Sequence, residues 1–444
     1  MNKEFHKKQN FFSFSDIDSE RKDRIMKFIS TEATPAPHVP PGVLRLTGAA
    51  KEDIPMYRIQ TMNKISPVGL NRFPSELYEV GDAVQDPQGI LVRSAKLLDL
   101  EFNPGLLAIA RAGVGVNNIP LDRCAAAGIP VFSTPGANAN AVKELVICAM
   151  LMGSRDIPGA IRWVREQAAS GADVSTVVEK GKSAFIGPEL YKKTLGIIGL
   201  GAIGSIVANT AISLGMDVYG YDPFLSVDTA LRLDRHVHVV KDINDLYKRS
   251  NYITMHIHYT EKTAHMIDAS AIAAMKRGVR VINLARGEIV DDEAMLTALD
   301  TGMVAAYITD FPNNRLLTAP HVIAMPHLGA STPESEQNCA AMAVDTLRDY
   351  LESGNIRSSV NLPEMTMDRS GVQRLCVLHK NVPGMLANIT SLFGRDGVNV
   401  ENLSNKSRGD YAYTMVDLGS KVGDNVIEDV RRTANVIRVR SLEW

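Results

Sequence analysis

Residues 194–224 read TLGIIGLGAIGSIVANTAISLGMDVYGYDPF, and the rest of the chain is organised around them. Leu195–Ile198 is a short apolar run, which is typical of a buried strand. Ser205–Leu214 has the spacing of a helix, and Asp217–Tyr221 has the composition of a second strand. A strand, a helix and a strand in this order form the βαβ unit with which a dinucleotide-binding α/β fold begins.

The turn between the first strand and the helix carries glycines in the pattern G-x-G-x-x-G, at Gly199, Gly201 and Gly204. The first makes a tight turn, the second lets the backbone approach a pyrophosphate, and the third lets the helix pack closely on the strand. Asp222 follows about twenty residues later, where a carboxylate binds the adenosine ribose hydroxyls and disfavours a 2′-phosphate. Glycine triplets also occur in ordinary loops, but the flanking strands, helix and acid favour a cofactor site. We expect NAD, with its pyrophosphate at the helix N-terminus.

The composition is that of a globular protein with more than one domain. The 444 residues are 45% hydrophobic and 22% charged, with a formal net charge of −2. A basic excess that would favour nucleic acid and an apolar run that would span a membrane are both missing from the sequence. The four cysteines show no C-x-x-C spacing, so we expect no metal site and no disulfide framework, and we expect Cys148 and Cys376 to be core thiols. The lack of targeting signals leads us to expect a cytoplasmic location.

The chain divides into an extension, a long α/β region and a small C-terminal domain. Residues 1–55 are polar with a proline-rich piece at 34–41, and we interpret them as a partly flexible extension with a short helix over 16–29. From Tyr57 strands and helices alternate, which predicts parallel sheets covered on both faces. Residues 372–444 have the order βαββαβ, a split βαβ domain. The predicted fold class is therefore α/β, with two doubly wound, Rossmann-like parallel-sheet domains followed by a βαββαβ domain.

Individual elements are predicted from apolar runs and turn residues. Long helices are expected over Asn140–Arg155 and Glu334–Ser353, and residues 160–191 are interpreted as a crossing between two domains. Further expected strands are Ile59–Met62, Ile90–Arg93, Leu107–Arg111, Pro130–Phe132, Tyr252–His256, Val279–Leu284, Val304–Thr309 and Val322–Ala324.

Two residues have the chemistry that hydride transfer to NAD requires, namely a cation for the substrate and a base for its hydroxyl proton. Arg286 follows a strand end in N-L-A-R-G, and a guanidinium can hold a carboxylate through two parallel hydrogen bonds. His327 follows the last short strand, and imidazole exchanges protons near neutral pH. Taken alone, Arg286 is also consistent with a surface arginine on a turn, and a lone histidine such as His327 is more often structural.

The glycine motif, Asp222, N-L-A-R-G at 283–287 and P-H-L-G-A-S-T at 326–332 together resemble the D-2-hydroxyacid dehydrogenase family. Within it, R-S at 93–94, R-A-G-V-G-V-N-N at 111–118 and the added C-terminal domain resemble the D-3-phosphoglycerate dehydrogenase branch. The resemblance covers roughly residues 57–444. It implies a discontinuous substrate-binding domain over residues 56–152 and 326–362, with an NAD-binding domain over 153–325 inserted into it. It also implies a C-terminal ACT regulatory domain over residues 372–444.

This resemblance implies oxidation of 3-phosphoglycerate to 3-phosphohydroxypyruvate, the first step of L-serine biosynthesis, with NAD as hydride acceptor. His327 is then the base, and Arg286 holds the carboxylate and the developing carbonyl oxygen. The remaining implied cofactor contacts are Ala202, Ile203, Ala285 and Asp310. The substrate phosphate is expected at residues near the strand ends, namely Lys64, Arg93, Ser94, Arg111 and Gly113. Taken singly, each of the three cations is also consistent with a solvated surface charge.

One position departs from the family pattern. The family usually pairs its histidine with a glutamate, and here Asn314 stands at the glutamate position. An amide can hydrogen-bond to imidazole but cannot stabilise imidazolium by charge, and the same exchange in a comparable triad lowered kcat by about 10⁴. Either Asp310 or Glu288 assists His327, or turnover is reduced.

Residues 377–403 resemble the start of an ACT domain, in which His379, Asn381 and Asn399 match the family's effector-binding positions. This match implies L-serine as an effector and a homodimer or homotetramer; the alternative is a pairing module without a ligand. Two other functions stay open, a dehydrogenase for another 2-hydroxy acid and a weakly catalytic sensor of NAD and an amino acid.

Overall fold

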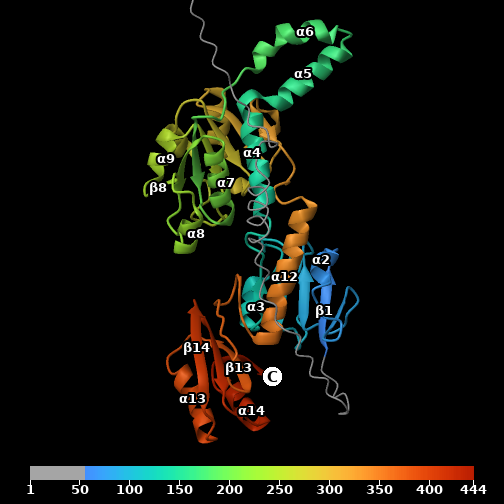
Figure 1. Cartoon of the computed structure of the whole chain (residues 1–444), viewed down its shortest axis with the longest axis vertical. Helices are drawn as coiled ribbons and strands as arrows, with labels where there is room; N and C mark the ends of the chain where they lie inside the picture. The colour runs from blue at the N-terminus through green and yellow to red at the C-terminus, as the bar shows by residue number, and fades with distance from the viewer. Residues whose placement is uncertain (1–55) are drawn as a thin grey trace, which may run out of the picture. The chain divides into compact units, whose positions relative to one another are not determined.

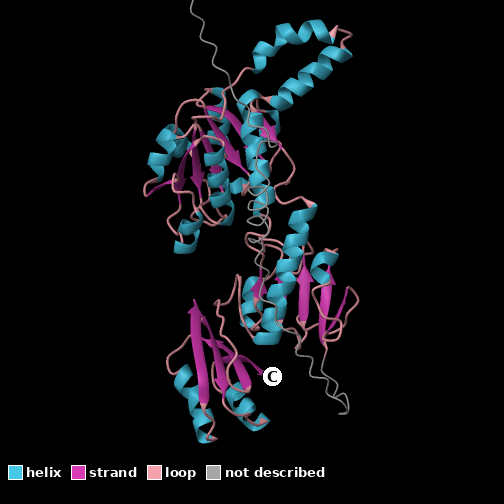
Figure 2. Cartoon of the chain, in the orientation of Figure 1, coloured by secondary structure: helices cyan, strands magenta, loops and turns pink. Residues whose placement is uncertain are grey.

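The computed structural model describes residues 56–444 (Figure 1). The extension expected over 1–55 and the helix expected over 16–29 lie outside the described residues. Three sheets form the framework of the described part and are drawn in magenta in Figure 2. None of the described helices combines the length and the apolar character needed to cross a bilayer.

The first sheet is parallel throughout, with the strand order β2-β1-β3-β4-β5. Neighbouring residues of β3 face opposite sides, because Ile90 packs with Cys124 of α3 and Leu91 packs with Leu347 of α12. Helices therefore cover both faces, as a buried parallel sheet requires. The elements are β1 (Tyr57–Met62), α2 (Pro67–Leu70), β2 (Tyr78–Gly81), β3 (Gly89–Val92), β4 (Ala108–Arg111), α3 (Leu121–Ala126), β5 (Val131–Phe132) and α12 (Pro333–Ser353).

The second sheet is also parallel, with the order β12-β11-β10-β9-β6-β7-β8. Ile197 of β6 packs with helices α4 and α7, and Ile198 faces the cluster that contains α9, α10 and α11. Its strands are β6 (Thr194–Ile198), β7 (Asp217–Tyr221), β8 (His238–Val240), β9 (Tyr252–Met255), β10 (Val279–Asn283), β11 (Val304–Thr309) and β12 (Val322–Ala324). The helices of this part are α4 (Ala139–Arg155), α7 (Ala202–Ser213), α8 (Val227–Arg232), α9 (Ile243–Arg249), α10 (Ala269–Ala273), α11 (Asp292–Asp300) and the 3₁₀ helices η3 (Gly287–Ile289) and η4 (Leu316–Thr318).

Residues 157–185 form a helical arm, α5 (Ile157–Ala169), α6 (Val174–Gly181) and η2 (Lys182–Phe185), at the top of Figure 1. No residue of these three helices is buried within the chain. The sequence predicts only a crossing segment here, because a helical segment with no buried residue in the described part of the chain is hard to distinguish from a linker.

The C-terminal sheet is antiparallel, with the order β14-β15-β13-β16. Its two faces have different partners. Leu375 and Val377 of β13 pack with the two helices of this domain, whereas Cys376 and Leu378 join the core that contains α12. The C-terminal domain and α12 thus share a continuous apolar core. The elements are β13 (Gln373–Lys380), α13 (Met385–Arg395), β14 (Val400–Arg408), β15 (Tyr411–Leu418), α14 (Asp424–Arg432) and β16 (Val436–Glu443).

The α/β fold class and the βαββαβ order of the tail are confirmed by these sheets. The edge strands β2 and β8 escape prediction because most of their residues are not buried, so neither strand forms an apolar run. The expectation that Cys148 is a core thiol is wrong, since it lies on an exposed position of α4, whereas Cys376 is buried. The apolar run around Cys148 belongs to a helix with only one covered face, so its neighbours are buried and it is not.

Candidate active site

The dinucleotide motif lies where the order of the second sheet reverses, between the carboxyl ends of β6 and β9. Gly199 has φ of 91°, and a Cβ there would lie 2.6 Å from the carbonyl oxygen of His256. A Cβ at Gly204 would collide with the Gly199 carbonyl oxygen, whereas one at Gly201 would meet nothing within 4 Å. The glycines at 199 and 204 therefore allow the turn and its helix to pack, and the one at 201 leaves open space at the helix N-terminus.

Asp222 is oriented by the same loop. Its Oδ2 accepts a hydrogen bond from the Leu200 backbone N–H at 2.9 Å, and its Oδ1 accepts one from Phe224 at 2.8 Å. These bonds hold the carboxylate beside the glycine loop, at the end of β7. A carboxylate in this position is suited to the ribose hydroxyls of a dinucleotide and repels a 2′-phosphate.

Arg286 is presented on a braced turn after β10. The Asn283 side chain donates to the Arg286 carbonyl at 2.8 Å and accepts from the Ala285 N–H at 3.2 Å, and Asn283 itself is fully buried. Arg286 Nη1 donates to the Ala285 carbonyl at 2.6 Å. A Cβ at Gly115, beyond β4 of the first sheet, would lie 2.7 Å from Arg286 Nη2. The guanidinium therefore contacts the loop after β4 from the opposite sheet.

Phe311 lies between the two predicted catalytic residues. The Arg286 guanidinium is 5.7 Å from the centre of the Phe311 ring, and the ring centres of Phe311 and His327 are 4.6 Å apart. The Arg286 and His327 side chains are thus brought to one aromatic ring at the carboxyl edge of the second sheet. His327 itself is exposed, as an acid–base group at a substrate cleft needs to be.

Asp310 is the acid that the structure brings to the His327 loop. Its Oδ2 accepts from the Gly329 N–H at 3.1 Å, while its Oδ1 is buried and has no hydrogen-bond partner among the described residues. Burial raises the pKa of Asp310, and the Gly329 hydrogen bond and the nearby His327 charge oppose that shift. Asn314 and Glu288 are both exposed, and their side chains make no hydrogen bond to His327 within residues 56–444. The geometry therefore favours Asp310 over the other two candidates as the carboxylate beside His327.

The predicted phosphate residues gather at the switch point of the first sheet, between β1 and β3. Asn63 lies in the loop after β1, and Ser94 and Ala95 lie in the loop after β3. The Asn63 Oδ1 accepts hydrogen bonds from the Ser94 N–H at 3.0 Å and from the Ala95 N–H at 2.6 Å. These bonds join the two loops. They bring the exposed Lys64 next to the loop that carries Arg93 and Ser94.

Three guanidinium groups converge beside these loops. Arg111 Nε donates to the Arg93 carbonyl at 3.0 Å, and a Cβ at Gly113 would collide with the Arg111 guanidinium. Burial lowers the pKa of Arg111, and the neighbouring charges of Arg286 and Arg93 lower it further. Within residues 56–444, neither Arg111 nor Arg286 forms an ion pair with a carboxylate. Mutually repelling, partly buried cations without counter-ions are suited to bind an anion.

The predicted effector residues are separated within one chain. His379 is buried, with Nδ1 2.8 Å from the Lys380 carbonyl and Nε2 2.9 Å from Thr414 Oγ1. Asn381 is exposed and donates to the Gly409 carbonyl at 3.1 Å, near the same end of the sheet. Asn399 is exposed at the opposite end, where its carbonyl accepts from Gly419. From β15 register, His379 and Asn399 are about 20 Å apart, so one chain does not bring them together.

Sequence reasoning misses four residues of the site: Asn63, Asn283, Phe311 and Glu336. The first two brace loops through side-chain bonds to backbone, and Asn283 was visible only as part of N-L-A-R-G. Phe311 contacts Arg286 and His327, and Glu336 of α12 forms an ion pair with Arg93. The partners in these contacts are distant in sequence. The one local signal was the position of Glu336 in the first turns of α12, directly after the P-H-L-G-A-S-T motif.

Residues 147–329 match the family model for the D-isomer specific 2-hydroxyacid dehydrogenase NAD-binding domain. A D-3-phosphoglycerate dehydrogenase of Haemophilus influenzae is 31% identical over 379 residues, which cover 82% of this chain and 88% of that protein. The chain belongs to the D-2-hydroxyacid dehydrogenase family. Its second sheet and glycine loop are accordingly an NAD-binding domain, as the sequence predicts.

Other relatives match in part. A D-3-phosphoglycerate dehydrogenase of Synechocystis sp. is 36% identical over 326 residues, or 71% of this chain, and the chain spans 56% of the length of that relative. An NAD⁺-bound 3-phosphoglycerate dehydrogenase structure from Entamoeba histolytica has 26% identity and a TM-score of 0.55, and the match covers 69% of this chain and 99% of that one. The solved structure of that relative contains bound NAD⁺.

Proposed function

We propose that this protein oxidises the C2 hydroxyl of 3-phosphoglycerate to the ketone of 3-phosphohydroxypyruvate with NAD as the oxidant, the entry reaction of L-serine synthesis. The observation that carries the proposal is the convergence of Arg93, Arg111 and Arg286. Arg111 is partly buried and has no carboxylate partner within residues 56–444, so an anionic ligand would neutralise the charge of the three arginines. A substrate with a carboxylate at one end and a phosphate at the other satisfies more than one of these cations.

The residues around the nucleotide fit NAD. The open space at Gly201 leaves room for the pyrophosphate, and the Asp222 carboxylate, held by the glycine loop, can accept hydrogen bonds from the ribose. The Oδ1 atom of Asp310, which has no partner among the described residues, can accept a hydrogen bond from an amide N–H. When bound, NAD supplies the hydride acceptor. The chain's own residues then have to orient the substrate, exclude water and remove one proton.

In this proposal His327 takes the proton from the C2 hydroxyl, and Arg286 binds the substrate carboxylate and the oxygen that becomes the carbonyl. Both side chains contact the Phe311 ring, so the base and the cation are positioned before substrate binds. Asp310 supplies negative charge near His327 when the imidazole becomes protonated. Arg93, Arg111, Lys64 and Ser94 hold the phosphate.

A substrate comparison tests the proposal. Initial rates of NADH formation are measured with 3-phosphoglycerate, glycerate and lactate, in the wild type and in Arg111→Met. We expect 3-phosphoglycerate to be preferred by kcat/KM, and the arginine variant to lose most of that preference while its rate with lactate changes little. A wild type that prefers glycerate or lactate would replace this substrate with another 2-hydroxy acid.

A second candidate, a weakly catalytic sensor of NAD and an amino acid, is favoured by Asn314 alone. In that case NAD binds with ordinary affinity, but no tested 2-hydroxy acid yields NADH. Equilibrium binding of NAD measured beside the rates separates the two candidates, because only the enzyme gives both.

We further propose that L-serine binds the C-terminal domain of a homodimer. Asn381 and Asn399 present exposed amides, and these have the donors and acceptors that both ends of an amino acid require. Because Asn399 lies at the other end of the sheet from Asn381, two chains have to pair for both exposed amides to share one ligand. The open edge of β14 supports such pairing.

Serine titration of the initial rate tests this regulation. We expect inhibition in the wild type and loss of the response in Asn399→Ala. The matched control is Asn388→Ala on α13, which removes an exposed amide elsewhere in the same domain. No response in the wild type would reject the effector role and leave a pairing module.

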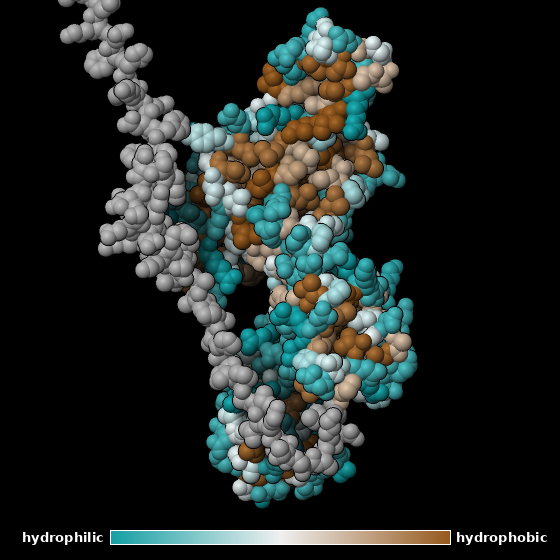
Figure 3. Space-filling model, turned by 45° about the vertical axis from the view of Figure 1, so that its right-hand side comes forward, coloured by the Kyte–Doolittle hydropathy of each residue, from teal (hydrophilic) through white to brown (hydrophobic). Residues whose placement is uncertain are grey.

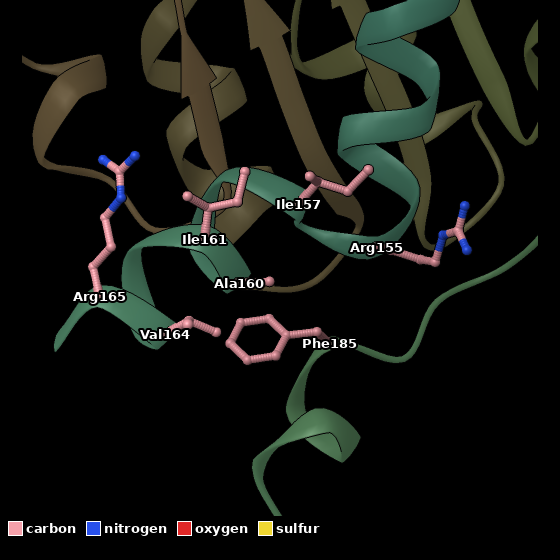
Figure 4. A pocket seen from close by; sticks show the side chains of 7 residues that line it. All are labelled: Arg155, Ile157, Ala160, Ile161, Val164, Arg165 and Phe185. Carbon is pink, nitrogen blue, oxygen red and sulfur yellow. The ribbon is translucent and has the colours of Figure 1, made fainter. Parts of the chain in front are cut away.

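The helical arm supports a second contact between copies of the chain. Apolar side chains gather at the upper end of the view in Figure 3, where the arm lies. Figure 4 shows Phe185 beside Val164 of α5, with Ile157 and Ile161 on the same helix. Ile161 is 50% exposed and Ile186 is 81% exposed. A second copy with the same apolar face buries Ile161, which is the usual geometry of a twofold interface.

Light scattering coupled to gel filtration tests this contact. We expect Ile161→Asp to reduce the oligomer by at least one step, whereas Val239→Asp, at a residue 48% exposed on β8, leaves it unchanged. An Ile161 variant with the wild-type mass would exclude the arm as an interface.

A further inference from the structure

The anion site contains one carboxylate of its own. Glu336 Oε1 lies 2.5 Å from Arg93 Nη2, and the two side chains are 45% and 42% exposed. Within residues 56–444, Arg93 is therefore the only one of the three converging arginines with an acidic partner. The pair joins β3 of the first sheet to α12, two elements far apart in sequence.

Stability does not explain this pair. Half-exposed ion pairs contribute little to folding, because solvent screens them and both side chains lose freedom. The first turn of α12 is already capped, since Thr332 Oγ1 accepts from the Ser335 N–H at 3.1 Å. Glu334 supplies an acid in the same turn and complements the helix dipole without contacting Arg93.

The helix that carries Glu336 is fixed at its other end by the C-terminal domain. Arg440 donates to the carbonyls of Tyr350 and Leu351 at 3.1 and 2.9 Å, and Tyr413 donates to that of Gly354 at 2.7 Å. The α12 backbone is therefore held in place when a ligand binds near its N-terminus. An anion that binds Arg93 has to draw the guanidinium away from Glu336, because the helix does not follow.

We propose that Glu336 is a displaceable counter-ion that holds Arg93 and keeps free anions out of the phosphate subsite. The inference rests on the proposed function for the identity of the substrate, but the subsite itself is defined by Arg93 and Arg111. An inorganic phosphate has only this subsite with which to displace the carboxylate. A substrate that is also held at Arg286 has a second point of attachment, so the same obstacle discriminates against the smaller anion.

Phosphate binding by the full-length protein tests the role of Glu336 without any turnover. The probe is inorganic phosphate, titrated calorimetrically into wild type, Glu336→Gln and Glu334→Gln. We expect the Glu336 variant to bind phosphate about two- to fivefold more tightly, the range that releasing an exposed ion pair allows. The Glu334 variant loses the same charge from the same helix turn, and we expect it to match the wild type.

Arg93→Met and the double variant Arg93→Met/Glu336→Gln establish that Glu336 acts through Arg93, since the two should then bind phosphate equally. With 3-phosphoglycerate, the effect of Glu336→Gln should appear in KM rather than in kcat. Unchanged or weaker phosphate binding by Glu336→Gln, or equal tightening by Glu334→Gln, would overturn the inference. If the wild type does not oxidise 3-phosphoglycerate but Glu336→Gln still tightens phosphate binding, the proposed function fails and the counter-ion role stands.

Discussion

Removing Asp417 from beneath Arg374 is expected to destabilise the C-terminal domain strongly. The two side chains are fully buried and joined by bonds of 2.5 and 2.7 Å, from Arg374 Nε and Nη2 to the two carboxylate oxygens. Asp417→Asn leaves a buried guanidinium without its counter-ion, which costs about 3–5 kcal/mol of unfolding free energy. Arg374 keeps its hydrogen bonds to the carbonyls of Ser353, Met367 and Asp368, so the variant still folds in the absence of denaturant.

Urea unfolding followed by tryptophan fluorescence measures this cost. The chain has two tryptophans, and Trp444 lies over Arg374 at 5.3 Å, so Trp163→Phe leaves a single reporter in the domain. The matched control is Asp345→Asn, which breaks a pair with Arg72 that is 47% exposed on both sides and should cost at most about 1 kcal/mol. A cost for Asp417→Asn no greater than that for Asp345→Asn would refute the reasoning.

Three further predictions follow from the site. Asp222→Ser should lower the preference for NAD over NADP about tenfold or more in kcat/KM, because it removes a charge-assisted ribose contact and the repulsion of a 2′-phosphate. Burial lowers the pKa of His256 to about 4 from 6.5, so the unfolded chain binds this proton first as pH falls. Stability should be complete above pH 6.5 and decrease by at most about 3 kcal/mol toward pH 4, and His256→Gln should lack that decrease in urea titrations at each pH. At saturating NAD, Asp310→Asn should lower kcat about 10²-fold, because Asp310 is the acid beside the His327 loop. Asn314→Glu should change kcat less than about twofold. The reverse order of effects would show that position 314, and not Asp310, assists His327.

The sequence predicts those parts of the molecule in which the interacting residues are close together in the chain. The glycine turn, the following helix and Asp222 are specified within one βαβ unit, and the structure confirms them as an NAD-binding fold. Gly354 likewise ends α12 in the left-handed conformation that its sequence position indicates.

What could not be predicted depends on contacts between distant elements. Nothing near Arg93 in the sequence points to Glu336, because their pairing requires β3 and α12 to meet. The burial of His379 follows from its place on the central strand β13, where its ring hydrogen-bonds to Thr414 of the neighbouring strand, so a matching motif alone does not make its ring accessible. The arm over 157–185 resembles a linker in sequence because none of its helical residues is buried within residues 56–444.

Deuterium transfer tests the central claim most directly, that hydride moves from the substrate to NAD between Arg286 and His327. The protein is incubated with NAD and 3-phosphoglycerate deuterated at C2, and the reduced cofactor is analysed by mass spectrometry. The account predicts deuterium in the NADH formed by the wild type and a loss of this product in His327→Ala. NADH without deuterium, or equal product from the histidine variant, would contradict it.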